Sequence, residues 1–187
     1  ESFTVALWVN VSDIAYPTSA IIVKAGRNCY YGPGREGGRP GWELGHGMNP
    51  NNGSLNVCLR DWTPSHNHTS GFQVRDKLWM DPPAKWNDLM HKWTHVVVVV
   101  DRGLASPSVR WFIDGVRQQH EISLAHLTAG PLYDMQHDNP LEIGMAYGWR
   151  ADGSYDEFRL YKRARSDADA RALYRYRPPL HACNTTS

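Results

Sequence analysis

The chain lacks any apolar run of the roughly 18 residues that a membrane-spanning helix needs. Its longest purely apolar stretch, Val96 to Val100, has the length of a strand. The first residues carry neither the basic nor the apolar region of a signal peptide, and the chain begins at Glu1 rather than Met. We therefore expect no membrane insertion, and a mature product or a piece of a larger protein.

An excess of charge of either sign is also missing. Twenty Lys and Arg are balanced by 19 Asp and Glu along 187 residues, which gives a net charge of +1. The basic residues form no stripe, so nucleic acid and anionic membranes are poor candidates as partners. A chain of this length fits one all-β domain and buries roughly two-thirds of its unfolded surface, so a single core suffices.

Cysteine is scarce, with three residues at Cys29, Cys58 and Cys183. This number fits an oxidising compartment with one bridge and one cysteine left over. We expect Cys29 to pair with Cys58 because both flank neighbouring strands, and Cys183 to pair outside the chain. The alternative is three free thiols in a cytosolic protein.

Four Asn-x-Ser/Thr sequons add to the case for secretion, where one or two would arise by chance. We expect glycosylation at Asn10, Asn52, Asn67 and Asn184. The last three lie in segments typical of loop or tail. Asn10 alternates with Val9 and Val11 in a strand pattern, so it would point away from their face.

Short strands with alternating apolar residues dominate the pattern. The predicted strands are Phe3–Val11, Ala20–Ala25, Trp42–His46, Leu55–Arg60, Trp93–Asp101, Val109–Ile113, Val116–Gln118, Leu141–Gly144 and Ser154–Tyr161, with a short one at Phe72–Val74. Asp114-Gly115 predicts a two-residue hairpin turn, because both positions need a positive φ.

One helix is predicted, over Ser166 to Tyr174, with Ser166 as its cap and Ala168, Ala172 and Leu173 facing inward. Strands followed by a single short C-terminal helix favour an all-β, two-sheet antiparallel sandwich. We expect the domain to span residues 1–177 and a polar tail or linker to span 178–187.

Four segments, taken in order, resemble the laminin-G-like (concanavalin-A-like lectin-glucanase) jelly rolls. They are Phe3-Thr4-Val5-Ala6-Leu7-Trp8-Val9, the strands at Ile21–Lys24 and Gly41–Gly45, the hairpin from Trp93-Thr94-His95-Val96 to Ile113-Asp114-Gly115, and Tyr155-Asp156-Glu157-Phe158-Arg159-Leu160-Tyr161. The resemblance implies a jelly roll and a structural Ca²⁺ near the closing strand, with Asp156 at the matching position. The alternative is that Asp156 only hydrogen-bonds to a neighbouring loop backbone.

Two features depart from this family. The family usually has a further strand before the first one here, so either the fragment is trimmed or an upstream segment completes the sheet. The region 61–91 is longer than the pattern requires, and a stretch of this kind is usually functional or an insertion.

Catalytic patterns are missing. Sandwich glycosidases place two carboxylates on one strand face, and no E-x-D-x-E pattern occurs. Asp156 and Glu157 are adjacent, so alternation would point them to opposite faces. His91 and His95 have the spacing of zinc ligands on a helix, but on a strand they would lie about 13 Å apart. We therefore predict no enzyme and no zinc site.

Large aromatics are abundant, with eight Trp and nine Tyr against four Phe. A sugar presents an apolar ring face and a rim of hydroxyls, so its site needs exposed aromatics beside polar groups on loops. The candidates are Tyr31, Trp62, Trp86 and Trp149; the alternative for each is packing over the sheet edge. Trp8, Trp93 and Trp111 lie in strand patterns and are expected in the core.

The sequence thus predicts a non-catalytic, secreted or cell-surface binding or adhesion module of a larger glycoprotein, with a glycan as ligand. Two alternatives stay open. One is a structural protein-interaction domain in an extracellular assembly. The other is an enzyme whose carboxylates come from distant strands.

Overall fold

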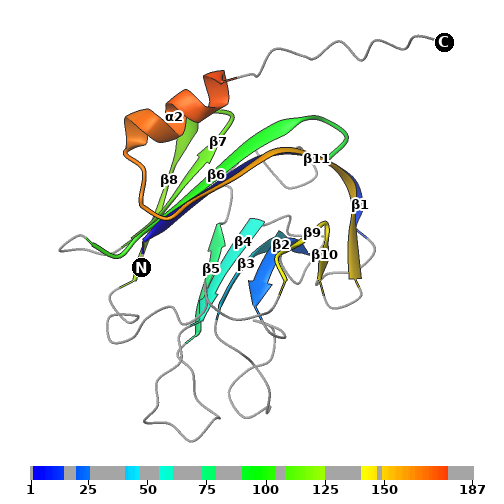
Figure 1. The fold of residues 1–187 in the computed structure, drawn as a ribbon, viewed down its shortest axis with the longest axis horizontal. Coiled ribbons are helices and arrows are strands. Elements are labelled where there is room, and N and C mark those ends of the chain that lie inside the picture. The colour runs from blue at the N-terminus through cyan, green and yellow to red at the C-terminus, as the bar shows by residue number, and fades with distance from the viewer. Residues whose placement is uncertain are drawn as a thin grey trace, which may run out of the picture.

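The structure is a computed structural model that describes residues 2–14, 20–25, 41–46, 55–60, 73–78, 90–103, 108–124, 140–146 and 149–176. In these ranges the strands form two stacked antiparallel sheets with one short helix on the outside (Figure 1). The all-β, two-sheet antiparallel jelly-roll sandwich with one C-terminal helix is confirmed.

The six-stranded sheet joins the two ends of the described chain. Its strand order is β10 (Met145–Ala146), β11 (Trp149–Tyr161), β1 (Phe3–Ile14), β6 (Thr94–Asp101), β7 (Ser108–Ile113) and β8 (Val116–Ser123). The turn between β7 and β8 is the predicted one, since Asp114 and Gly115 have φ of 50° and 77°.

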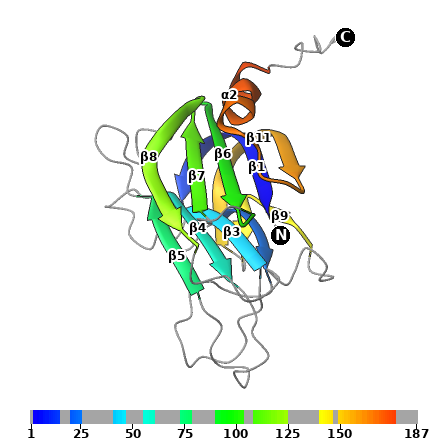
Figure 2. The same ribbon diagram turned by 90° about the vertical axis from the view of Figure 1, so that its left-hand side faces the viewer.

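The five-stranded sheet has the order β5 (Gln73–Leu78), β4 (Leu55–Arg60), β3 (Gly41–His46), β2 (Ala20–Ala25) and β9 (Glu142–Ile143). Figure 2 shows its strands stacked beneath the other sheet. Several strands have other bounds than predicted. β5 spans Gln73–Leu78 rather than Phe72–Val74, β9 ends before Gly144, whose φ is 72°, and β8 and β11 are each longer than predicted. The sequence pattern does not predict β10.

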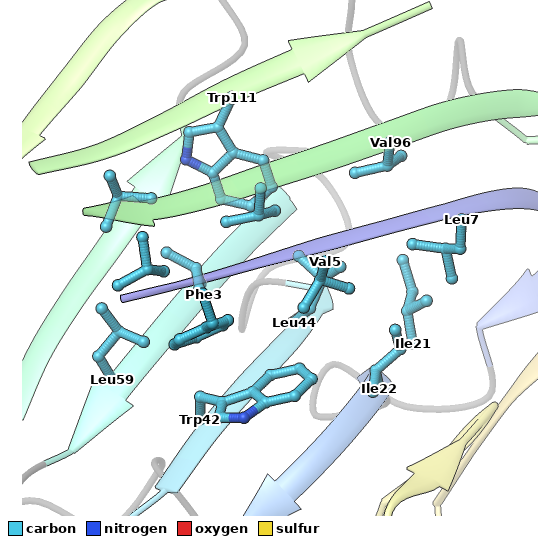
Figure 3. Packing of buried hydrophobic residues seen from close by; sticks show 14 of the residues in the cluster. Phe3, Val5, Leu7, Ile21, Ile22, Trp42, Leu44, Leu59, Val96 and Trp111 are labelled. Atoms are coloured by element: carbon cyan, nitrogen blue, oxygen red, sulfur yellow. The ribbon is translucent and has the colours of Figure 1, made fainter. Parts of the chain in front are cut away.

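The core lies between the sheets and is built from alternate residues of each strand (Figure 3). Phe3, Val5 and Leu7 of β1 face Trp42 and Leu44 of β3, and all five are nearly inaccessible to solvent. The Phe3 and Trp42 rings lie 5.3 Å apart between centroids. Each such side chain stabilises the fold by roughly 1.5–3 kcal/mol, so this layer is the main source of stability.

The outer face of the six-stranded sheet carries a second apolar layer, because helix α2 (Asp167–Arg175) packs on it. Its buried members are Ala6, Val97, Val99, Phe112 and Ala170. The predicted cap is confirmed: Ser166 accepts a hydrogen bond from the Asp169 backbone N–H. Of the three residues predicted to face inward, Leu173 does so in part, but Ala168 and Ala172 are exposed and Ala170 is the buried one.

Charged groups fix the first turn of α2 to the sheet. The Asp167 carboxylate accepts from Arg110 of β7, and from Arg117 of β8 at 2.8 Å. Arg110 also donates to the Arg165 carbonyl at 3.1 Å. Because Arg110 and Asp167 are largely shielded from water, these charge-assisted bonds are stronger than exposed ion pairs.

We therefore expect Asp167→Ala to lower the free energy of unfolding by about 2 kcal/mol, because the shielded Arg110 guanidinium loses its nearer carboxylate and keeps only Asp101, at 3.5 Å. Asp169→Ala, in the same turn but exposed, is the control and should cost well under about 1 kcal/mol. Urea denaturation of both variants measures the difference. Equal losses of unfolding free energy in the two variants would show that Asp167 stabilises the fold only through its interaction with the helix dipole.

Candidate functional site

Helix α2 covers only part of the outer face of the six-stranded sheet, and β1 and β11 extend beyond it (Figure 1). In this uncovered part Trp93 is 46% exposed, Ser154 and Asp156 are exposed, and Asn10 is half-buried. We name these four residues the Trp93 surface. It contains the only two predicted site residues whose side chains the structure describes, Asn10 and Asp156.

Strand pairing brings the four residues together from three parts of the sequence. Asn10 of β1 is paired with Ser154 of β11, and Trp8 with Asp156. On the other side of β1, Val9 is paired with Thr94 of β6, so the preceding Trp93 lies next to Asn10. Paired residues share a face, and neighbouring strands are about 5 Å apart, so the four form one continuous surface.

An aromatic layer supports this surface beside the end of α2. The ring centroids of Trp8 and His95 lie 5.1 Å apart, those of Trp8 and Tyr174 5.6 Å, and those of His95 and Tyr174 5.9 Å. A Cβ on Gly115 would meet the Tyr174 ring at 2.9 Å, so the glycine turn and α2 fit closely. Through Tyr174, the helix thus packs on the part of the sheet next to the Trp93 surface.

His95 is the titratable group of this layer. It is 3% exposed, and its backbone N–H donates to Asp114 Oδ1 at 2.8 Å. Burial, which disfavours the charged imidazolium, lowers the pKa of His95 to about 4; Asp114 opposes this effect and Arg159 adds to it. At neutral pH His95 is therefore uncharged and acts as an aromatic packing residue.

The sheet irregularity at Glu157 changes one expectation. A bulge lies in β11 opposite β1 between Ala6 and Trp8, and Glu157 has φ of 52°. Glu157 Oε2 accepts from Arg159, a residue paired with Ala6 of the outer layer, at 2.6 Å. The expectation that Asp156 and Glu157 point to opposite faces is therefore wrong, because the bulge breaks the alternation.

Asp156 supplies a single carboxylate to any cation here. Its Oδ1 accepts the Glu157 backbone N–H at 2.8 Å, which is a contact within the strand rather than to a loop. Calcium takes six to eight oxygen ligands. Within the described ranges, His, Cys, Asp and Glu side chains form no group of three that could hold a metal. Backbone carbonyl oxygens also bind calcium, so Ca²⁺ at Asp156 stays a prediction.

Gly153 allows β11 to approach β1 at the edge of the Trp93 surface. A Cβ at this position would meet the Asn10 carbonyl oxygen at 2.4 Å, which is an impossible approach. Ser12 Oγ also donates to the Asp152 carbonyl at 3.1 Å. The backbone that carries Asn10 and Ser154 is thus tightly joined.

Most of the sites predicted from sequence lie outside the described residues. These are Tyr31, Trp62, Trp86, Cys29, Cys183, Asn52, Asn67 and Asn184. Trp149 begins β11 and Cys58 lies in β4 opposite Glu43, and only their backbone is described. The glycan-binding, disulfide and glycosylation assignments therefore stay predictions.

Of the three Trp expected in the core, Trp111 is fully buried as predicted. Trp8 is half-buried on the outer face, and Trp93 is exposed, so the expectation for Trp93 was wrong. The run Val96 to Val100 is buried on both faces because α2 covers the outer one, which hides the alternation that would have placed Trp93 outside. No sequence signal distinguishes Trp93 from a core residue.

A family model described as the Concanavalin A-like lectin/glucanases superfamily matches residues 1–171. The sequence matches none of the curated proteins with which it was compared. Among the described residues, no helix is long and apolar enough to cross a membrane.

Solved structures share the fold at low sequence identity. The chain is similar to the Ruminococcus gnavus IT-sialidase CBM40, with a TM-score of 0.57, 12% identity, and coverage of 93% of this chain and 83% of that one. The same domain bound to alpha2,3 sialyllactose gives a TM-score of 0.56 at 14% identity, with the same coverage. An HCR/D point mutant gives 0.53 at 13% identity; 94% of this chain is covered, but the chain spans only 37% of that protein.

The neutral, buried His95 makes stability depend on pH. Its pKa rises from about 4 in the fold to its ordinary value of 6.5 on unfolding, so the unfolded chain takes up a proton first as pH falls. The stabilisation is complete above pH 6.5 and is lost between pH 6.5 and about 4, by an amount on the order of 3 kcal/mol.

Thermal or urea unfolding from pH 7.5 to 4 tests this expectation. His95→Phe keeps an aromatic ring and should flatten the dependence in this window. His91→Asn, at an exposed position with φ of 59°, should leave it unchanged. A wild-type slope that survives in His95→Phe would assign the effect to other groups.

Proposed function

The chain belongs to the Concanavalin A-like lectin/glucanases superfamily, and we propose that it is a non-catalytic carbohydrate-binding module of an extracellular glycoprotein. The observation that carries the proposal is the exposed Trp93, which lies among an amide, a hydroxyl and a carboxylate on an open sheet face. The CBM40 similarity supports it, since that domain has this fold and is seen with a bound sugar.

The chemistry of the Trp93 surface suits a sugar. Carbohydrates combine apolar C–H faces with a rim of hydroxyls, and an exposed indole beside hydrogen-bonding groups complements both features. A solitary exposed aromatic needs no explanation. Asn10, Ser154 and Asp156 make Trp93 different, because each offers a donor or acceptor to solvent within one or two strand spacings.

The carboxylates of this region favour binding over hydrolysis. Glycoside hydrolysis needs two carboxyl groups on either side of the scissile bond, one of them as proton donor. Here Glu157 is bound to the Arg159 guanidinium at 2.6 Å, and Asp156 is its neighbour in sequence on an exposed strand. The Arg159 guanidinium occupies the Glu157 carboxylate, which supports binding rather than hydrolysis.

The extracellular part of the proposal rests on the sequence. The four sequons, at Asn10, Asn52, Asn67 and Asn184, and three cysteines that allow one bridge favour a secreted or cell-surface protein. A Cys29–Cys58 bridge, a Cys183 partner in another segment, and a Ca²⁺ ion near Asp156 belong to the same proposal. If the parent protein carries this module on the cell surface, glycan binding by the module would make the cell adhere to surfaces that carry the glycan.

A glycan array probed with the folded domain, with and without Ca²⁺, tests the function. We expect selective binding to a set of related glycans, and no release of reducing sugar from the same ligands over a day. A calcium requirement would support the ion as well. Absence of binding in both conditions would contradict the proposal and leave a protein-interaction domain as the better explanation, while turnover would make the protein an enzyme.

A further inference from the structure

We propose that the Trp93 surface binds a neutral chain of β-linked pyranose units with equatorial hydroxyls, laid along the open face of the six-stranded sheet. This inference rests on the proposed function and adds to it the location and the chemical class of the ligand. Neither the family match nor the similar structures assign a ligand site to these residues.

Trp93 supplies the stacking platform. Nearly half of its surface is open to solvent (46%), although it precedes a strand whose following residues are buried on both faces. Pyranose rings with equatorial hydroxyls present apolar C–H faces above and below the ring, which pack against an indole. When a sugar ring covers the Trp93 indole, apolar surface is removed from water, which contributes favourably to the free energy of binding.

The hydrogen-bonding groups lie on one side of this platform. Asn10 is the cross-strand neighbour of Trp93, and Ser154 is the next residue in the same row. Asp156 lies in the adjacent row, two residues further along β11. Neighbouring strands are about 5 Å apart, so Asn10 can contact a sugar ring that lies over Trp93, whereas Ser154 is two strand spacings, about 10 Å, from Trp93. Ser154 and Asp156 are therefore placed to contact the equatorial hydroxyls of the next unit of a chain.

The charged side chains that the structure describes on this surface disfavour anionic sugars. Asp152 and Asp156 are both exposed on this part of β11, whereas Glu157 and Arg159 neutralise each other. Lys92, beside Trp93, is exposed and offsets one of the two free carboxylates. A net negative surface repels carboxylated sugars and gives neutral ones no penalty. The expected ligand therefore differs in charge from the sialyllactose bound by the CBM40 domain.

The open shape favours a chain over a single terminal sugar. The four residues lie on three adjacent antiparallel segments whose side chains stand out from a sheet face, and three of the four are exposed. A terminal residue is recognised by walls that surround it, whereas an extended chain needs only a flat strip. β1 and β11 provide such a strip beyond α2 (Figure 1).

Calorimetric titration of the bacterially produced domain with cellohexaose tests the platform. Wild-type protein should bind, Trp93→Ala should weaken binding about tenfold or more, and Trp93→Phe should recover part of it because an aromatic face remains. Val116→Ala shortens an apolar side chain that is more exposed than Trp93 (64%), at the β7–β8 hairpin, and should leave binding unchanged. Unchanged thermal unfolding of Trp93→Ala confirms that the loss concerns binding.

A second titration tests the charge. Carboxymethylated cello-oligosaccharides of the same length should bind at least several-fold more weakly than cellohexaose at low salt, and the gap should shrink as salt rises. Asp156→Asn should narrow the gap as well, whereas Asp169→Asn on the exposed face of α2 should not.

The outcomes separate the two proposals. Binding that is equal in wild type and Trp93→Ala, or binding to other glycans but not to cellohexaose, overturns the inference and leaves the proposed function intact. No glycan binding at all overturns both. The inference departs from the expectation, drawn from the sequon, that Asn10 is glycosylated. An N-glycan found on Asn10 in protein secreted by a eukaryotic host would therefore overturn the inference, because the attached sugar would occupy this surface.

Discussion

The pairing of β1 with both β6 and β11 is the constraint on which the rest of the molecule depends. Through it, the first described residues lie between strands from the middle and the end of the chain. The inner face of β1 then meets the five-stranded sheet, and its outer face is shared between α2 and solvent. Any shift in register by one residue would exchange these two faces and bury Asn10 in place of Val9.

The outer face of the six-stranded sheet is apolar under α2 and mainly polar beyond it. Where α2 lies, the sheet presents Ala6, Val97 and Phe112, and shielded ion pairs to Asp167 hold the helix in place. Where α2 ends, aromatic packing of Trp8 and His95 against Tyr174 closes the apolar layer. Beyond this border the sheet becomes polar, with Trp93 as the exposed exception. The helix thus covers one part of the outer face and leaves the Trp93 surface exposed.

Local patterns in the sequence were sufficient for the location of most strands, the Asp-Gly turn and the helix cap, because each depends on neighbouring residues. They did not give every strand bound or the buried face of the helix. The candidate site depends on contacts that local patterns do not contain. Trp93 reads as a core residue, since the valines after it are buried on both sides by partners distant in sequence. The bulge at Glu157 occurs without a glycine, so nothing in the residue types indicates that two adjacent acids will share one side of the sheet.

The most direct test of the central claim, that the open end of the six-stranded sheet contacts carbohydrate, is an NMR titration of isotope-labelled protein. The Trp93 indole N–H signal, assigned by its loss in Trp93→Phe, should shift on addition of cellohexaose together with the backbone amides of Asn10, Ser154 and Asp156. Shifts confined to the five-stranded sheet, with the Trp93 indole signal unmoved at saturation, would contradict it.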